Sequence, residues 1–229
     1  MAFIERIRHL IHKKSDRRSF SLNNLDTKLE KHLDFQNGFF IEAGANDGIT
    51  QSNTVYFEKY KKWKGLLIEP IPDLAEKCKL NRPKCIVENC ALVSTEFQDK
   101  FIEMRYANLM SVISGGMKNI DEENLHIAKG LEIQNLDSSY NINVPAITLS
   151  SIIEKHNIKN IDLLSLDVEG YEIEVLKGLD FNKYRPHYML IEARYRDEIE
   201  LFIGNLYSAI DELSYHDILY KLKNFDHGA

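Results

Sequence analysis

Apolar and polar residues alternate in short runs along most of the chain. Five apolar runs have the length and the flanking turn residues of buried strands, at 39–43, 65–69, 85–93, 161–168 and 187–193. Helical spacing is found between them, at 53–60, 73–80 and 152–157, and again from about Gly170. Such alternation predicts an α/β fold in which helices cover both faces of a mainly parallel sheet.

Two further apolar runs, 207–213 and 216–223, are separated by a short turn. They predict an antiparallel hairpin at one edge of the sheet, which then has seven strands and is mostly parallel. Ser151 and Glu154 form a capping-box pair, which predicts that the helix over 152–157 begins beside them.

The segment 107–143 is polar and has little periodicity, although Ile102, Met104 and Tyr106 just before it alternate as in a strand. A long segment of this kind inside a compact domain is usually a lid or a mobile insertion. We therefore expect an N-terminal helical extension over 1–36. A single domain follows over 37–229, with a lid-like insertion at about 107–143.

The first 18 residues are basic, and Phe3, Ile7, Leu10 and Ile11 recur at helical spacing. They predict an amphipathic helix that packs on the domain. The alternative is peripheral contact with an anionic membrane surface.

Composition narrows the class of protein. The chain has 229 residues, 44% of them hydrophobic and 28% charged, as in an ordinary globular protein. Its net charge of −6 argues against bulk binding to nucleic acid. No run is long enough to span a membrane. The cysteines, Cys78, Cys85 and Cys90, form no C-x-x-C pair, so we expect reduced thiols, no zinc and a cytoplasmic protein. The oligomeric state stays open.

The stretch FFIEAGANDG over 39–48 places Glu42, Gly44 and Gly48 in the pattern E-x-G-x-x-x-G after a strand. This is not the G-x-G-x-x-G of a dinucleotide site. Acidic residues around the loop would repel a pyrophosphate and suit a cationic or hydroxyl-bearing ligand. S-adenosylmethionine has an ammonium, a sulfonium and a ribose diol.

A second acid, Glu69, ends the strand GLLIEP. An acid at the end of the second strand of an α/β sheet can accept both hydrogen bonds of a ribose diol. The alternative is a solvated strand end. Together with the glycine loop, Glu69 predicts a nucleoside site.

Four stretches resemble the FkbM family of S-adenosylmethionine-dependent methyltransferases, and they are IEAGANDG (41–48), LLIEP (66–70), VENCALV (87–93) and IDLLSLDVEGYEIEVLKGLDF (161–181). The last is the most specific, and LIEAR (190–194) and DILYKLK (217–223) also fit. The resemblance implies a Rossmann-like methyltransferase fold and methyl transfer to an oxygen. It also implies that the acceptor is a hydroxyl of a sugar, glycoconjugate or other natural product.

The resemblance also implies which residues bind the cofactor, and their positions in the glycine loop and at the strand ends agree with it. They are Glu42, Gly44, Ala45, Asn46, Gly48, Asn53, Glu69, Pro70, Ile71, Asn89 and Cys90. Glu42 would face the methionine ammonium directly or through water, and Glu69 would hold the ribose hydroxyls. Asn53 is first interpreted as the cap of the following helix.

Asp167 and Glu169 are the candidate catalytic residues, because ligands of open α/β sheets bind beyond the carboxyl ends of the strands. A carboxylate there could accept the proton of an alcohol. The alternative for Asp167 is a helix cap, and Glu172 and Glu174 are expected to be surface or structural residues. Asp167, Glu169 and Glu192 could hold a divalent cation such as Mg²⁺, but no spacing demands one and this is the less favoured alternative.

His187 and His216 are expected to be structural, although a histidine would be a good base at neutral pH. Two other functions stay open. The chain could be a nucleotide-dependent sugar-modifying enzyme, or a non-catalytic binding module on a methyltransferase fold.

Overall fold

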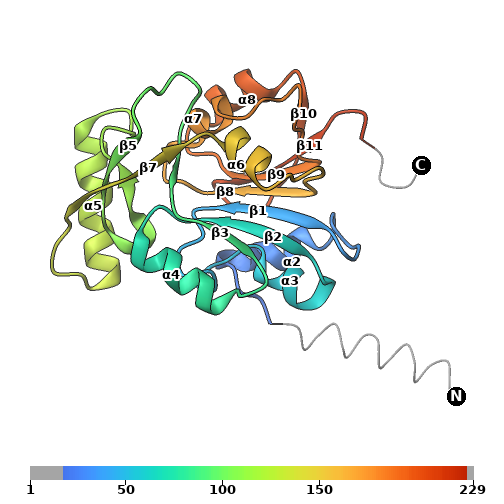
Figure 1. Ribbon diagram of the computed structural model, residues 1–229, viewed down its shortest axis with the longest axis horizontal. Coiled ribbons are helices and arrows are strands. Elements are labelled where there is room, and N and C mark those ends of the chain that lie inside the picture. Colours follow the sequence, from blue (N-terminus) through green and yellow to red (C-terminus); the bar gives the residue numbers. More distant parts are fainter. Residues whose placement is uncertain (1–17, 226–229) are drawn as a thin grey trace, which may run out of the picture.

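The structure is a computed structural model that describes residues 18–225. Its centre is a seven-stranded sheet with the order β10-β11-β9-β8-β1-β2-β3 (Figure 1). The strands are β1 (Phe39–Ala43), β2 (Lys64–Ile68), β3 (Ile86–Glu88), β8 (Leu163–Leu166), β9 (Tyr188–Glu192), β10 (Tyr207–Glu212) and β11 (Asp217–Leu222). The first five pair in parallel, while β11 pairs antiparallel with both β9 and β10. The predicted parallel sheet and edge hairpin are confirmed.

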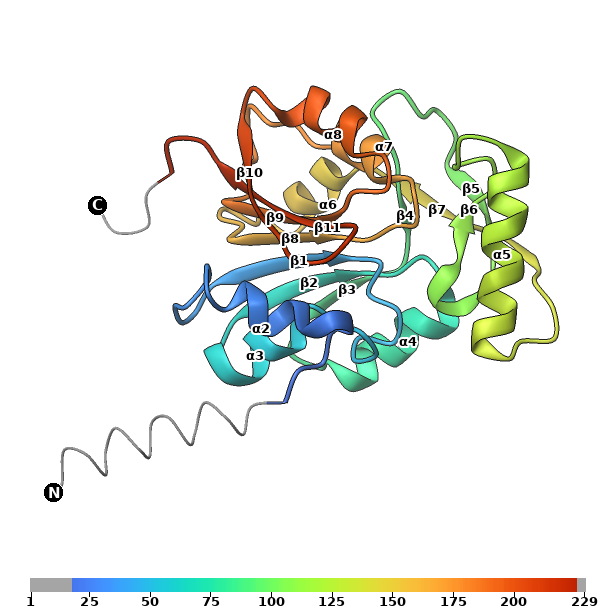
Figure 2. The same ribbon diagram turned by 180° about the vertical axis from the view of Figure 1, so that it is seen from behind.

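Helices cover both faces of this sheet (Figures 1 and 2). One face carries α2 (Leu25–Leu29), α3 (Val55–Lys61) and α4 (Pro72–Asn81), and the other carries α6 (Leu149–Lys155), α7 (Glu172–Lys177) and α8 (Arg196–Ile203). The alternation of side chains along β1 explains the two layers. Phe40 packs in the core that contains Tyr56 and Phe57, whereas Ile41 packs in the core of Leu149 and Val175.

A second, four-stranded sheet has the order β4-β7-β5-β6. Its strands are β4 (Ala91–Leu92), β5 (Phe101–Arg105), β6 (Val112–Ile113) and β7 (Asn141–Ile147). The strand predicted from the alternation of Ile102 and Met104 is confirmed as β5. The prediction of one strand over 85–93 is wrong, because this run divides between two sheets. The amide of Asn89 donates to the carbonyls of Glu69 and Pro70 at 2.9 and 2.8 Å, and there the chain leaves the first sheet.

The segment 107–143 contains a short 3-10 turn, η2 (Asn108–Met110), and a 15-residue helix, α5 (Ile120–Gln134). The side chain of Asn119 caps α5 by accepting from the backbone N of Glu122 at 2.8 Å. The sequence pattern does not indicate this helix because its buried face mixes Glu123, His126 and Ile127, whereas Leu125 is exposed.

Two helix starts differ from the sequence analysis. Helix α6 begins at Leu149, capped by Thr148, whose side chain accepts from the backbone N of Ser151. The capping pair predicted at Ser151 is therefore wrong. The N-cap of α3 is Thr54, so the interpretation of Asn53 as the cap is also wrong.

The described part of the N-terminal extension packs against the domain. Leu25, Leu29 and Leu33 are buried in the core cluster that contains Phe40 and Tyr56. The amphipathic helix predicted over 1–18 lies almost wholly outside the described residues. None of the described helices is both long and apolar enough to cross a membrane.

Candidate active site

A cavity of about 470 Å³ opens beyond the carboxyl ends of β1, β2, β8 and β9. Its walls come from both sheets and from α5. Strand-end residues that line it include Glu42, Gly44, Glu69, Asp167 and Glu192. The volume lies in the usual range of small-molecule sites, which is about 300–1,000 Å³. The cavity thus lies at the carboxyl ends of the strands, where the sequence predicts that a ligand binds.

Gly44 allows the loops after β1 and β8 to approach closely. Its φ is +84°, and a Cβ added there would lie 1.9 Å from the carbonyl oxygen of Asp167. A side chain at this position would therefore collide with backbone as well as strain the turn. Gly44 therefore allows its loop to lie directly beside Asp167, the candidate catalytic acid.

The carboxylate of Glu42 organises the loop before α3. Its oxygens accept hydrogen bonds from the Ser52 hydroxyl (3.0 and 2.9 Å), the Asn53 backbone N (2.8 Å) and the Thr54 hydroxyl (2.6 Å). Glu42 lines the cavity, but a ligand ammonium would have to share these oxygens.

Glu69 is buried at the cavity wall and is held by backbone. One carboxylate oxygen accepts from the N of Asn46 at 2.7 Å and the other from the N of Ile71 at 2.9 Å. Each oxygen keeps a lone pair for a further donor, as a diol requires. Burial raises the pKa of Glu69 to about 7, although these two N–H groups favour the ionised form.

The remaining predicted cofactor residues divide into two groups. Ala45, Asn46, Asn53, Pro70 and Cys90 line the cavity, whereas Gly48, Ile71 and Asn89 do not. An added Cβ on Gly48, whose φ is +81°, would meet Arg82 and Cys78, so this glycine serves packing on α4. Ile71 contributes its N–H to Glu69, and Asn89 holds the carbonyls beside it.

Asn53 has a free acceptor in the cavity wall. Its amide nitrogen donates to the Ser165 hydroxyl at 3.1 Å. Its Oδ1 is buried and has no hydrogen-bond partner among the described residues. Because a buried carbonyl oxygen without a donor is costly, Asn53 is suited to a ligand N–H or O–H.

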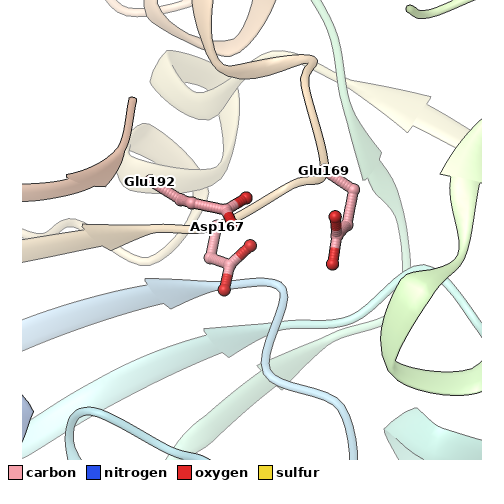
Figure 3. A group of neighbouring side chains, drawn as sticks. All are labelled: Asp167, Glu169 and Glu192. Carbon is pink, nitrogen blue, oxygen red and sulfur yellow. The ribbon is translucent and has the colours of Figure 1, made fainter. Parts of the chain in front are cut away.

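Asp167, Glu169 and Glu192 face a common space beyond the strand ends (Figure 3). One carboxylate oxygen from each lies within 4.8 Å of the others. The side chain of Asp167 is exposed toward the open cavity, yet its poor solvation among the strand ends, together with the charges of Glu192 and Glu169, raises its pKa above the usual value. Burial and Glu192 raise the pKa of Glu169 to about 8, against the opposing effect of Arg194. A carboxyl group with the pKa of Glu169 can exchange a proton near neutral pH.

The turn that carries Glu169 is locally constrained. Glu169 has a φ of +57°, which is uncommon for a residue with a side chain. The buried carboxylate of Glu172 accepts from the backbone N of Val168 (3.2 Å) and of Gly170 (2.9 Å). Of the two interpretations offered for Glu172, the structural one is confirmed. Asp167 makes no cap bond to α7, whose preceding turn is held by Glu172 instead.

Two functional candidates escaped the sequence analysis. Arg194 donates to Glu169 at 2.9 Å and lies 3.9 Å from Glu192. His126, on α5, has its Nε2 3.3 Å from the same Glu169 oxygen. Arg194 falls in the stretch LIEAR, directly after a strand, and that position could have indicated it. No comparable signal marks His126.

The histidines singled out from the sequence lie elsewhere. His187 contacts Asp162 at 3.1 Å and stacks on Phe225, and neither His187 nor His216 lines the cavity. The three cysteines are free thiols.

The family model described as the methyltransferase FkbM domain matches residues 42–225. No curated protein matches the chain. Among solved structures, TrmK of M. capricolum, in complex with the cofactor product S-adenosylhomocysteine, has a TM-score of 0.43 and 10% identity, covering 88% of this chain and 70% of its own. A TehB-like S-adenosylmethionine-dependent methyltransferase from Corynebacterium glutamicum has a TM-score of 0.41 and 11% identity, covering 97% of each. Neither superposition is close enough to carry an argument.

The cavity fits the cofactor of this family. Glu69 offers oriented carboxylate oxygens, Asn53 offers an unpartnered buried oxygen, and the Gly44 loop keeps side chains out of the approach. The family match spans Glu42, Glu69 and the candidate catalytic residues Asp167 and Glu169. The prediction of a methyltransferase is thereby confirmed. The chain belongs to the FkbM family and is an S-adenosylmethionine-dependent methyltransferase.

Proposed function

We propose that this enzyme methylates a hydroxyl oxygen of a small-molecule acceptor, namely a sugar or a glycoconjugate. The observation that carries the proposal is the pair Asp167 and Glu169, whose carboxyl groups face the cavity directly beside the Gly44 loop. An alcohol must lose a proton as its oxygen is methylated, and a carboxylate beside the transferred methyl group can accept that proton.

We assign the cofactor end of the cavity to the strand ends of β1 and β2. Glu69 holds the ribose hydroxyls, and Asn53 and the loop over Gly44 and Asn46 hold the methionine part. When bound, S-adenosylmethionine supplies an electrophilic methyl group on a sulfonium. The protein contributes alignment, since an in-line displacement depends first on the position of the attacking oxygen.

Proton transfer is assigned to Asp167 and Glu169. As the oxygen–carbon bond forms and the carbon–sulfur bond breaks, the hydroxyl proton passes to one of these carboxylates. Both pKa values are raised, so the ionised form of each group is a stronger base than an ordinary carboxylate. Arg194 keeps Glu169 in place through their ion pair.

The far wall of the cavity supports a polar acceptor with apolar faces, as sugars have. Tyr171 and Met110 offer apolar surface, while Lys129 on α5 offers a hydrogen-bond donor. The amide nitrogen of Gln134 is already bonded to Ala107 and Gly130, which positions its side chain at the wall.

The test is direct detection of the product. The protein is incubated with methyl-labelled S-adenosylmethionine and a panel of free sugars, nucleotide sugars and lipid-linked oligosaccharides, and methyl ethers are sought by mass spectrometry. Label on a sugar oxygen supports the proposal. Label only on nitrogen or sulfur acceptors in a matched panel would refute it.

A further inference from the structure

The three carboxylates at the ends of β8 and β9 are only partly neutralised by protein groups. Arg194 is the cation in contact with the group, at 2.9 Å from Glu169 and 3.9 Å from Glu192. For Asp167, the described residues provide neither an ion pair nor a side-chain hydrogen bond. Three acids and one guanidinium leave an excess of two negative charges when all are ionised, which is the charge of one divalent cation.

A separate observation from α5 points to the same place. His126 is more than nine-tenths buried, and its Nε2 lies 3.3 Å from Glu169 Oε2 without a hydrogen-bond partner among the described residues. A buried imidazole nitrogen that faces a carboxylate oxygen and has no hydrogen-bond partner is suited to a cation bound beside that oxygen.

Glu192 provides a third observation that points to a cation. Its Oε2 is also buried and has no hydrogen-bond partner in the described part of the chain. Because Glu192 comes from β9, Asp167 and Glu169 from the loop after β8, and His126 from α5, these donors converge from different elements. A cluster formed in this way is not explained by local helix or turn chemistry.

We propose that Asp167, Glu169 and Glu192 bind one divalent cation of the oxygen-preferring class, Mg²⁺ or Mn²⁺, with His126 beside the Glu169 ligand oxygen. The three oxygens lie within 4.8 Å of one another. In an octahedral Mg²⁺ shell with metal–oxygen bonds of about 2.1 Å, adjacent oxygens are about 3.0 Å apart and opposite ones about 4.2 Å, so a small inward movement of these side chains brings all three into one shell. Three protein oxygens leave ligand positions for water and for hydroxyls of an acceptor. The neighbouring imidazole favours Mn²⁺ as the probe, since nitrogen donors suit transition metals better than Mg²⁺.

The catalytic consequence rests on the proposed function, whereas cation binding does not. A cation at this position would orient an acceptor hydroxyl and stabilise the negative charge that develops on its oxygen. Vicinal hydroxyls, which sugars carry, could bind it as a pair.

The experiment measures Mn²⁺ binding to the full chain in the presence of S-adenosylhomocysteine and without any acceptor. Electron paramagnetic resonance of free Mn²⁺ gives stoichiometry and affinity. We expect one Mn²⁺ per chain, competition by Mg²⁺, and at least about tenfold weaker binding in Glu192→Gln, since even second-shell changes cost 10–100-fold. The matched control is Glu198→Gln, which makes the same change at an exposed acid paired with Lys118 outside the cavity.

Melting temperature and S-adenosylhomocysteine binding show whether Glu192→Gln is folded, and Asp167→Asn replaces it if it is not. No stoichiometric Mn²⁺ binding at millimolar concentration, or equal affinity in wild type and the folded cavity variant, would overturn the inference. The two proposals fail separately. Binding of Mn²⁺ without methylation of any hydroxyl refutes the acceptor class alone, and full sugar methylation in EDTA refutes the catalytic role of the cation alone.

Discussion

At the scale of single residues, the site depends on acids whose surroundings differ. Glu42 is saturated by hydrogen bonds from the loop before α3, Glu69 is held by two backbone N–H groups, and Glu172 supports a turn. Asp167 has no such partner and is open to the cavity. The same side-chain chemistry therefore serves loop structure in some places and is left available for a ligand in others.

Asp167→Asn should retain the fold and S-adenosylhomocysteine binding but lower turnover by roughly 10²–10⁴, the contribution of a positioned acid or base. Asparagine keeps the shape of the side chain and removes a charge that its acidic neighbours disfavour, so stability should not fall. Single-turnover rates measure the effect, with an acceptor that the wild-type enzyme methylates. Normal turnover in a folded variant would remove Asp167 from the mechanism and direct attention to Glu169 or Glu192.

Glu69→Ala should weaken S-adenosylmethionine binding at least tenfold. The ribose diol would lose two hydrogen bonds to a charged group, which are worth about 1.5–3 kcal/mol each. Isothermal titration gives the affinity, and Glu76→Ala, on the exposed side of α4, is the control. Unchanged affinity would place the ribose elsewhere.

The raised pKa of Glu69 also predicts a pH dependence. Below about pH 7 the buried carboxyl is largely protonated in the free enzyme, and above it the ionised form accepts hydroxyl hydrogens more strongly. Affinity for S-adenosylhomocysteine should therefore rise from about pH 6 to about pH 8. The contribution of Glu69 to stability changes with pH in the opposite direction. Because the pKa of Glu69 in the folded protein exceeds its ordinary value of 4.5, this group's contribution to the free energy of unfolding falls as pH rises from 4.5 to about 7. Glu69→Gln should remove both trends.

At the scale of elements, α5 is the part that joins the second sheet to the active site. Its residues His126, Lys129 and Gln134 line the cavity, and His126 contacts the turn after β8. Ala107 and Ile127 belong to a small core cluster of this region, separate from the cores of the large sheet. An element with its own small core can shift without disturbing the main fold.

We expect the segment 107–143, including α5, to become more protected from hydrogen exchange when S-adenosylhomocysteine and acceptor are both bound. Closure would exclude water from the transfer. Peptides from α6, which packs in the main core, provide the internal control. Equal and high protection of 107–143 in every state would show that the segment is not a lid.

At the scale of the whole molecule, the described part of the N-terminal extension is integral to the domain. Leu29 is fully buried in a core that also contains side chains of β1 and α3. Leu22, just before α2, reaches the cavity wall. Residues 18–36 therefore support the sheet that carries the active site.

Leu29→Ala should lower the free energy of unfolding by about 2–5 kcal/mol, the usual cost of removing a buried leucine. Urea denaturation followed by circular dichroism measures the change. Lys31→Ala, at an exposed position two residues away, should have little effect. If both variants lost the same small amount, the extension would be peripheral to the fold.

The parallel sheet, the edge hairpin and the acids at the strand ends follow from the sequence alone. Strand periodicity is local, and the carboxyl ends of parallel strands meet at one edge, so Glu42, Glu69, Asp167 and Glu192 could be assigned to one site before any contact was known. Tertiary structure decided the rest. The run 85–93 divides between two sheets because pairing partners lie far away along the chain. Helix α5 brings His126 to the site on a buried face that mixes polar and apolar residues, so no apolar periodicity in the sequence indicates it. Burial and mutual repulsion, which set the pKa values of Asp167 and Glu169, arise only when these segments are packed together.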